Sequence, residues 1–513
     1  MEFQKIKLHR SEKNRAAVTQ ITLDDDYNVP DYRQDIVKVI KERGELRFDE
    51  VKAMEGAAWI KVLYRSDKQE GKISCLRGEI PFQERLNMDG LSEYDAVHAT
   101  GDMEDLTIGV INSRKLNVRA VIVLTASSEK EVDEELTCEL SDGSSYEQNI
   151  VEKEALKLLV VRRDICRQKS EAVLPSSKPN IREILWQSMQ LRNVESRLVE
   201  GNIRLSGEIL VSILYNDEEE GEHLSWYETT VPLDAQAECG VMEDDCIWQV
   251  QMVPLTMELE VKPDYDGEER ILVMELALDT HIRIWKEEKI RLLTDLYSLQ
   301  KEVKPVFREC PLERLLVKNA AKCRMTEQME LKEDKEKVLQ ICSCEGKVLL
   351  ERQEIKPDGV LAEGTVEVNI LYITPDDHMP VGAVQEIYPF SQLVEIPEMS
   401  AQAKVELDAS LEQLSAVMLD QEHVEIRAAV RLDLIAFVQE VIQNIEEATE
   451  SEPDLEMLRN RPGLVGYIAK AGDDLWTIAR ENHTTIQNIM ETNHRKSEVL
   501  LAGEKVLIVK QVG

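Results

Sequence analysis

The chain lacks the features by which an enzyme or a membrane protein is usually recognised. It has no window close to the roughly 18 uninterrupted apolar residues that a membrane-spanning helix needs. Residues 1–10 contain neither the apolar stretch nor the cleavage site of a secretory signal peptide. No glycine-rich phosphate loop, G-x-S-x-G turn or H-E-x-x-H zinc helix occurs, and the eight histidines are dispersed. We therefore expect no catalytic site, no cofactor, no membrane insertion and a cytoplasmic location.

Paired cysteines are also missing. The nine cysteines form no Cys-x-x-Cys motif, and the closest two, Cys342 and Cys344, have no histidine near them in the sequence. An odd number of scattered thiols favours a reducing compartment over a disulfide framework. This spacing predicts free thiols and no metal site.

Positive charge is scarce. The chain has 62 Lys and Arg against 99 Asp and Glu, a formal net charge of -37. Such a surface repels nucleic acid and anionic membranes, so we expect neither as a partner and favour a basic or apolar one. Residues 464–510 carry six basic and six acidic residues. The C-terminal part is thus neutral, and the rest of the chain holds the whole acidic excess.

What the chain does contain is a domain-sized repeat. Three glycines each stand eight residues before the tyrosine of a Leu-Tyr pair, and a proline with a bulky apolar residue after it follows each tyrosine by seventeen residues. The tyrosines are 151 and 157 residues apart, which indicates three copies of one domain. The positions are Gly56, Tyr64, Pro81 and Phe82, then Gly207, Tyr215, Pro232 and Leu233, then Gly364, Tyr372, Pro389 and Phe390.

Hydrophobic periodicity predicts strands in each copy. In the second copy Ile209, Val211 and Ile213 alternate with polar or outward residues and share one face with Tyr215. Further alternating segments cover residues 116–124, 270–278 and 424–434. Aromatic residues are only 5% of the chain, and Asp-Gly and Pro-Asp dipeptides separate the alternating runs. We expect a mainly β protein with little helix before its C-terminal part.

The repeat and the composition together predict a domain plan. The joint before the last module is an acidic run that repels itself and stays extended, which is typical of a tether. A short helical continuation from Val438 is the alternative, because Ile442 and Ile445 extend an apolar period. The expected divisions are an N-terminal segment 1–22, repeats 23–165, 166–305 and 306–445, an acidic linker 446–463, and a last module 464–511.

The last module contains the most specific motif, Gly466-Tyr-Ile-Ala-Lys-Ala-Gly-Asp-Asp-Leu-Trp-Thr-Ile-Ala479. Gly472 turns the chain out of a strand, and Asp473 or Asp474 can cap a first helix. Thr484-x-x-Gln487 has the spacing of a capping box for a second helix. A strand containing residues 506–508 follows the turn at residues 501–503. This βααβ pattern resembles a LysM domain.

The LysM resemblance implies a binding site. Members of that family usually bind N-acetylglucosamine polymers in a shallow groove between two loops, which correspond here to residues 471–474 and 493–503. Trp476 either borders that groove or packs against the second helix. Charged residues at 494–498 replace a short Gly- and Ser-rich turn, so the ligand is either a glycan or a protein. The candidate binding residues are Ile468, Gly472, Asp473, Asp474, Trp476, Asn493 and Leu501.

Three acidic β-rich repeats followed by one LysM domain resemble the SPOCS-domain proteins of spore-forming Firmicutes. The resemblance implies a fold of three SPOCS-like β domains plus a βααβ LysM domain. It also implies a non-enzymatic morphogenetic protein of the mother cell, in which the LysM domain binds the coat-base ATPase SpoIVA at the forespore surface. Other coat proteins are further expected partners. The alternative is a glycan-binding protein of the cortex or cell wall, and a wall hydrolase ranks third because no catalytic constellation is visible.

Overall fold

The structure, a computed structural model, describes residues 1–50, 55–67, 72–84, 96–141, 145–218, 223–332, 335–400, 402–453 and 462–510. Within these ranges the chain is almost entirely β-strand, with two short helices near its C-terminus. None of the described helices is long and apolar enough to cross a membrane. The expected mainly β fold is confirmed.

The first unit consists of six antiparallel strands in two sheets. The sheet orders are β1-β6-β5 and β2-β3-β4, and the two sheets enclose one apolar core that includes Ile60, Val62, Leu116 and Ile122. The strands are β1 (Phe3–Asn28), β2 (Ile36–Glu50), β3 (Glu55–Ser66), β4 (Ile73–Gln83), β5 (Ala96–Asn112) and β6 (Lys115–Leu140).

The same strand order recurs twice more. The second unit pairs β7-β12-β11 and β8-β9-β10, and the third unit pairs β13-β18-β17 and β14-β15-β16. Each has its own core between its two sheets. The second unit contains β7 (Glu147–Val173), β8 (Ile181–Val199), β9 (Asn202–Asp217), β10 (Leu224–Glu238), β11 (Ile247–Pro263) and β12 (Glu269–Tyr297). The third contains β13 (Glu302–Glu330), β14 (Gln340–Lys356), β15 (Gly359–Ile373), β16 (Val381–Glu395), β17 (Lys404–Met418) and β18 (His423–Ser451).

The repeated tyrosines tie each unit's third strand to the loop before its second strand. All three are fully buried. Tyr64 donates its hydroxyl to the carbonyl oxygen of Gln34 at 3.1 Å, Tyr215 to that of Pro179 at 3.2 Å and Tyr372 to that of Glu336 at 3.1 Å. A buried phenol needs an acceptor, and these bonds supply it. The tyrosine therefore fixes the same loop in every unit.

The repeated glycines lie where two backbones come close. A Cβ at Gly56, Gly207 or Gly364 would collide with a carbonyl oxygen of the neighbouring strand, at Arg47, Arg192 or Leu349 respectively. A register shift disrupts the ladder beside each of these contacts. The apolar residue after each repeated proline, Phe82, Leu233 or Phe390, is the cross-strand partner of the glycine. The proline itself lies on an outer strand, where its missing N–H is tolerated.

The three units pack against one another through the face of β3, β9 and β15 that is turned away from each unit's own core. Leu63, Leu214 and Leu371, each directly before a repeated tyrosine, meet in one buried cluster. Beside them Glu345 of the third unit accepts hydrogen bonds from Lys41 and from the indole of Trp186, both at 2.9 Å. Burial alone would raise the pKa of Glu345, but the charges of Lys41 and Arg43 outweigh it and hold that pKa low.

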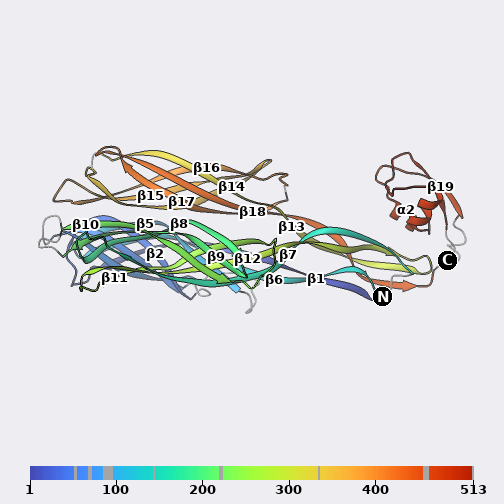
Figure 1. Cartoon of the computed structure of the whole chain (residues 1–513), viewed down its shortest axis with the longest axis horizontal. Helices are drawn as coiled ribbons and strands as arrows, with labels where there is room; N and C mark the ends of the chain where they lie inside the picture. Colours follow the sequence, from blue (N-terminus) through green and yellow to red (C-terminus); the bar gives the residue numbers. More distant parts are fainter. Residues whose placement is uncertain are drawn as a thin grey trace.

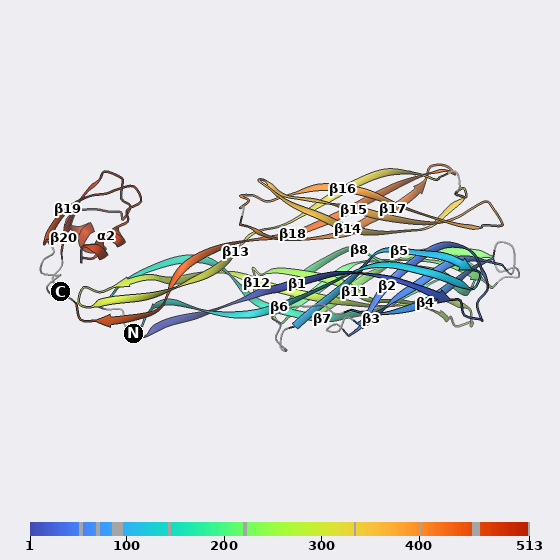
Figure 2. The same ribbon diagram turned by 180° about the vertical axis from the view of Figure 1, so that it is seen from behind.

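The long strands extend beyond these sandwiches as a stem. The stem consists of the outer parts of β1, β6, β7, β12, β13 and β18, and its core contains Leu8, Leu136, Ala155, Ile290, Leu292, Cys310, Leu312 and Ile442. Figure 1 shows these strands running to one end of the molecule, near the N-terminus, with the two helices beyond them. Figure 2 shows the same arrangement from behind.

The strands place the expected domain boundaries inside elements. Residues 3–22 of the expected N-terminal segment lie in β1, and the boundaries at 165/166 and 305/306 fall within β7 and β13. Residues 446–451 of the expected linker pair as the end of β18, which excludes the helical continuation there; residues 454–461 lie outside the described residues. Pairing with β13 gives one edge of this acidic run backbone hydrogen bonds. We therefore propose to divide the chain between β6 and β7 and between β12 and β13.

Candidate interaction site on the C-terminal module

The C-terminal module is a two-stranded sheet with two helices. Its elements are β19 (Leu464–Ile468), α2 (Leu475–Glu481), α3 (Ile486–Thr492) and β20 (Lys505–Val509). Leu475, Ile478 and Ala479 of α2 pack on Ile489 of α3 and on Val506 of β20. The helical spacing in the sequence is what aligns these side chains. The expected βααβ order is confirmed.

Both helices begin at a polar cap. Asp474 caps α2, accepting hydrogen bonds from the Thr477 backbone N–H at 2.7 Å and hydroxyl at 2.9 Å. Thr485 caps α3 and accepts from the Asn488 N–H at 3.1 Å. The capping box expected at Thr484 is therefore wrong by one residue, because the Thr484 hydroxyl instead accepts from the Asn488 side chain at 2.8 Å.

The two loops expected to line the groove are held by internal bonds. Gly472 has φ +92°, a conformation that favours glycine. Asp473 accepts from the Tyr467 hydroxyl and from the Lys470 N–H, both at 2.8 Å. Asn493 exchanges two hydrogen bonds with the backbone of Leu507, each 2.7 Å. Of the predicted residues, Asp473, Asp474 and Asn493 thus have their side-chain oxygens engaged within the module.

Two predicted residues present apolar side chains to solvent. Ile468 is 61% exposed and Leu501 is 70% exposed. Ile468 lies on the outer face of the sheet together with Leu464 and Leu507, which the sequence reasoning missed. Their positions at alternate residues of two short strands were the available signal. Gly466, directly opposite Leu507, adds no side chain to this face.

Trp476 contacts the stem. Its indole N–H donates to Asp295 at 2.8 Å, and its ring meets the ring of Tyr297 edge-on at a centroid distance of 4.9 Å. Arg480 pairs with the same Asp295 carboxylate at 2.6 Å, and Tyr297 donates its hydroxyl to the Thr484 carbonyl oxygen at 2.9 Å. Burial, with the charges of Glu147 and Asp295, raises the pKa of Tyr297. The ring is thus half-buried against β12 of the second unit.

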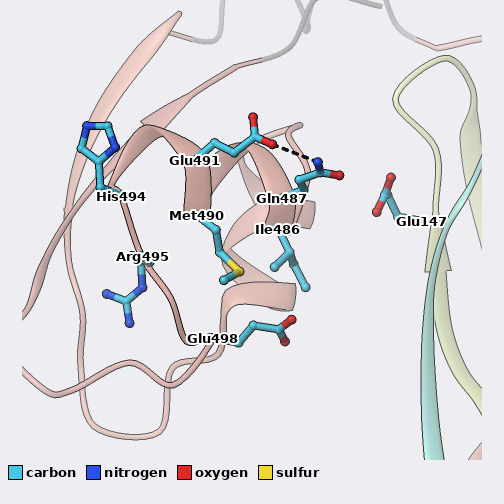
Figure 3. Close-up of a pocket in the computed structure, with 8 residues that line it drawn as sticks. All are labelled: Glu147, Ile486, Gln487, Met490, Glu491, His494, Arg495 and Glu498. Carbon is cyan, nitrogen blue, oxygen red and sulfur yellow. Dashed lines mark hydrogen bonds between the residues drawn. The ribbon is translucent and has the colours of Figure 1, made fainter.

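A cleft of ≈ 640 Å³ lies between α3 and the stem. Ile486 and Met490 form its apolar side, and Glu147 of β7 faces them, as Figure 3 shows. Gln487 donates to Glu491 at 2.9 Å along its rim. Arg495 pairs with Glu504, so one cation of the charged segment 494–498 is held by an ion pair within its own loop. The rim of the cleft carries charges of both signs and its base is apolar, a chemistry that suits a peptide or an amphipathic ligand.

Within the described ranges no group of three or more His, Cys, Asp or Glu side chains is placed to hold a metal ion. Burial raises the pKa of the thiols of Cys342 and Cys344 to about 12, which keeps them protonated. The geometry of the module supports binding.

Comparisons with known proteins agree with the motifs. The SipL SPOCS-domain family matches residues 35–111 and 337–419, and the LysM-domain family matches residues 467–509. No curated protein matches the chain. A crystal structure of the ferric yersiniabactin uptake receptor FyuA from Yersinia pestis aligns with 84% of this chain and 80% of its own, at 9% identity and a TM-score of 0.11. At that score the alignment carries no argument about the fold.

Proposed function

Because the chain is a SipL-like sporulation protein with SPOCS domains and a C-terminal LysM domain, we propose that it is a non-enzymatic adaptor of spore-coat assembly. In this proposal the LysM domain binds a SpoIVA-like coat-base ATPase, and the adaptor tethers the coat to the forespore surface from the mother cell. The acidic units engage further coat proteins. Both kinds of domain found in the chain are binding domains, which supports a role without catalysis.

We further propose that the second unit is a third SPOCS copy. The matched segments correspond to β2–β5 of the first unit and β14–β17 of the third. The equivalent strands of the second unit, β8–β11, have the same sheet order. Tyr215 bonds to its loop as the other two tyrosines do, and Gly207 meets the same kind of backbone contact.

One observation carries the choice of a protein partner for the LysM domain. The outer face of its sheet presents Leu464, Ile468 and Leu507 with exposures of 60%, 61% and 41%. The face is flat because Gly466 lies among them. Lys505, directly opposite Ile468, adds one positive charge to this face. A cluster of exposed apolar side chains with a charge beside it suits the core and rim of a protein interface better than a polyhydroxylated sugar.

The test is calorimetric titration of the full chain with the purified ATPase. We expect saturable binding, and we expect Ile468→Lys to weaken it about tenfold or more, because a lysine placed in a buried contact loses its hydration. Ile387→Lys is the matched control, since Ile387 is 58% exposed on β16 of the third unit. Equal affinities for both variants and the parent chain would refute the proposed face.

A glycan-binding protein of the cortex or cell wall is the second candidate. The cleft beside α3, with its polar rim, is the observation that favours it. Titration of the same full chain with N-acetylglucosamine oligomers distinguishes the two. Binding to the oligomers with none to the ATPase would replace the adaptor proposal with a glycan anchor.

A further inference from the structure

The stem consists of three two-stranded ribbons, β1–β6, β7–β12 and β13–β18, which can be compared position by position. Close to the C-terminal end of β6, β12 and β18 each ribbon has a register shift at one extra residue, Cys138, Thr294 or Glu446. Two residues before it stands a cross-strand pair. The three pairs are Ile6 with Leu136, Val151 with Leu292, and Arg308 with Asn444. Leu136, Leu292 and Asn444 are all buried. The third ribbon therefore has a polar pair where the other two have apolar ones.

The side chain of Asn444 joins all three ribbons. Its nitrogen donates to the carbonyl oxygens of Thr137 at 2.8 Å and of Leu293 at 3.1 Å. Its oxygen accepts from the backbone N–H of Thr137 at 2.8 Å. Thr137 belongs to the first unit and Leu293 to the second. These bonds use both ends of the amide, so a leucine at this position could replace none of them.

Arg308, the cross-strand partner of Asn444, contacts the first unit. Its guanidinium lies 3.5 Å from the carboxylate of Glu134 and donates to the carbonyl oxygen of Glu135 at 2.8 Å. Glu134 is 9% exposed and also pairs with Arg10 of its own ribbon at 3.1 Å. At the position of Glu134 the other two ribbons have isoleucines, Ile290 and Ile442. The first and third ribbons thus meet through opposite charges at positions that are aliphatic in the second.

The inner sheets of the three units contain a similar contact. Glu345 of the third unit accepts hydrogen bonds from Lys41 of the first and from Trp186 of the second, both at 2.9 Å. Arg43 and Ser188 hold the register position of Glu345 in the first and second units. In the stem and in the inner sheets alike, one side chain of the third unit bonds to both other units.

Buried polar contacts of this kind discriminate between partners, because a wrong partner leaves polar groups unpaired. In the third place of the stem, the first or second unit of another copy would bring a leucine instead of Asn444 and an aliphatic side chain instead of Arg308. The backbone groups of Thr137 and Leu293 would then lose the bonds that Asn444 makes. Glu134 would lose one of its two cationic neighbours. A single buried asparagine fixes register and partner choice in the same way in coiled coils.

We propose that Arg308, Asn444 and Glu345 make the surface formed by the first two units selective for the third unit, and that the units excluded are the first and second units of another copy. The chain needs such selectivity because its three units share one strand order and meet in one apolar stem core. Units that resemble one another can assemble across chains during folding, which links chains into larger species.

The experiment unfolds the full chain in urea, refolds it at several protein concentrations and measures the masses of the folded species by size-exclusion chromatography with light scattering. The reference is the parent chain that was never unfolded. The refolded parent chain is expected to regain the reference masses. The double variant Arg308→Val with Asn444→Leu copies the second ribbon. Its ratio of larger species to the reference form should rise with concentration and exceed that of the parent at least about tenfold.

Three further variants separate selectivity from other effects. Arg324→Val with Gln443→Leu makes the same kinds of exchange at exposed positions of β13 and β18. Leu432→Ala removes a fully buried side chain from the third unit's own core and so lowers stability without changing the contact between units. Arg308→Lys keeps the positive charge beside Glu134. All three are expected to refold to the reference masses.

The proposal is overturned if the double variant regains the reference masses at every concentration. It is also overturned if Leu432→Ala forms larger species to the same extent, since lost stability would then be the cause. If the double variant does not refold, Asn444→Leu alone decides by the same criterion. The measurement involves no partner protein, so its failure leaves the adaptor proposal standing.

Discussion

At the residue scale, Lys61 carries a charge into the contact between units without adequate compensation. Its Nζ is buried with no hydrogen-bond acceptor among the described residues. The ring of Trp186 lies 5.0 Å away, while Glu345 bonds to Lys41. Burial, the largest cause, lowers the pKa of Lys61 from 10.5 to about 8. The protonated amine therefore opposes folding at neutral pH.

We predict that Lys61→Met stabilises the protein by about 1–3 kcal/mol at pH 7. Because the folded pKa is below the unfolded one, the unfolded state binds more protons between about pH 8 and 10.5, and the stability of the parent chain rises with pH there. The advantage of the variant should shrink over that window. Urea unfolding of both proteins at pH 7 and pH 10 measures it. A variant less stable than the parent at pH 7 would contradict this account.

The sequence predicts the positions of the repeated residues but not their roles. The spacing between Gly207 and Tyr215 can be read from the sequence. The hydrogen bond from the Tyr215 hydroxyl to Pro179 cannot, because it joins residues 36 positions apart. Trp476 shows the same limit. Its two alternatives, packing and partner contact, were equally compatible with the motif, and the residue that it contacts, Asp295, lies 181 positions away in another domain.

At the scale of single elements, the glycine of β15 should be irreplaceable. A Cβ at Gly364 would collide with the backbone oxygen of Leu349 and would lie 2.9 Å from the ring of Phe390. We predict that Gly364→Ala destabilises the protein by about 2–4 kcal/mol, because the backbone of Leu349 is held in the paired strand and cannot move away easily.

The matched control is Gly109→Ala in β5, where a Cβ would have no atom within 4 Å. For this variant we expect the free energy of unfolding to change by no more than about 1 kcal/mol, because alanine only reduces the conformational freedom of the unfolded chain. Denaturant unfolding of both variants checks the pair of expectations. Equal losses of stability would show that the close approach at Gly364 is not what requires glycine.

Element types were predictable where periodicity is strong, and element ends were not. The alternation before Tyr215 predicts a strand, which is β9, and the 3.6-residue spacing around Ile478 predicts a helix, which is α2. The extent of β18 to Ser451 was missed because its acidic end pairs with β13 and contributes Ile445 to the stem. Repulsion among the acidic side chains predicted an extended tether from residue 446. In the structure, backbone pairing with β13 outweighs that repulsion as far as Ser451.

At the scale of the whole molecule, the packing of three units around a common contact was not visible in the sequence. The alternation that predicts a half-buried strand assigns Leu214 to the outward face. In the structure that face is buried against Leu63 and Leu371 of the other two units. The fold of one unit follows from local pattern, whereas the choice of its neighbours depends on side chains such as Trp186 and Glu345 that meet only after each unit has formed.

The position of the LysM domain depends on one carboxylate of the stem. Asp295 accepts from both Trp476 and Arg480, and its loss leaves an indole N–H and a guanidinium without their acceptor. We predict that Asp295→Ala releases the domain from the stem, so that small-angle scattering shows a larger average dimension while the units stay folded. Glu275→Ala, on the same strand but paired with Lys169 at an exposed site, should leave the scattering unchanged. An unchanged curve for Asp295→Ala would contradict this dependence and would mean that the contacts of Tyr297 with Trp476 and Thr484 are enough to hold the domain in place.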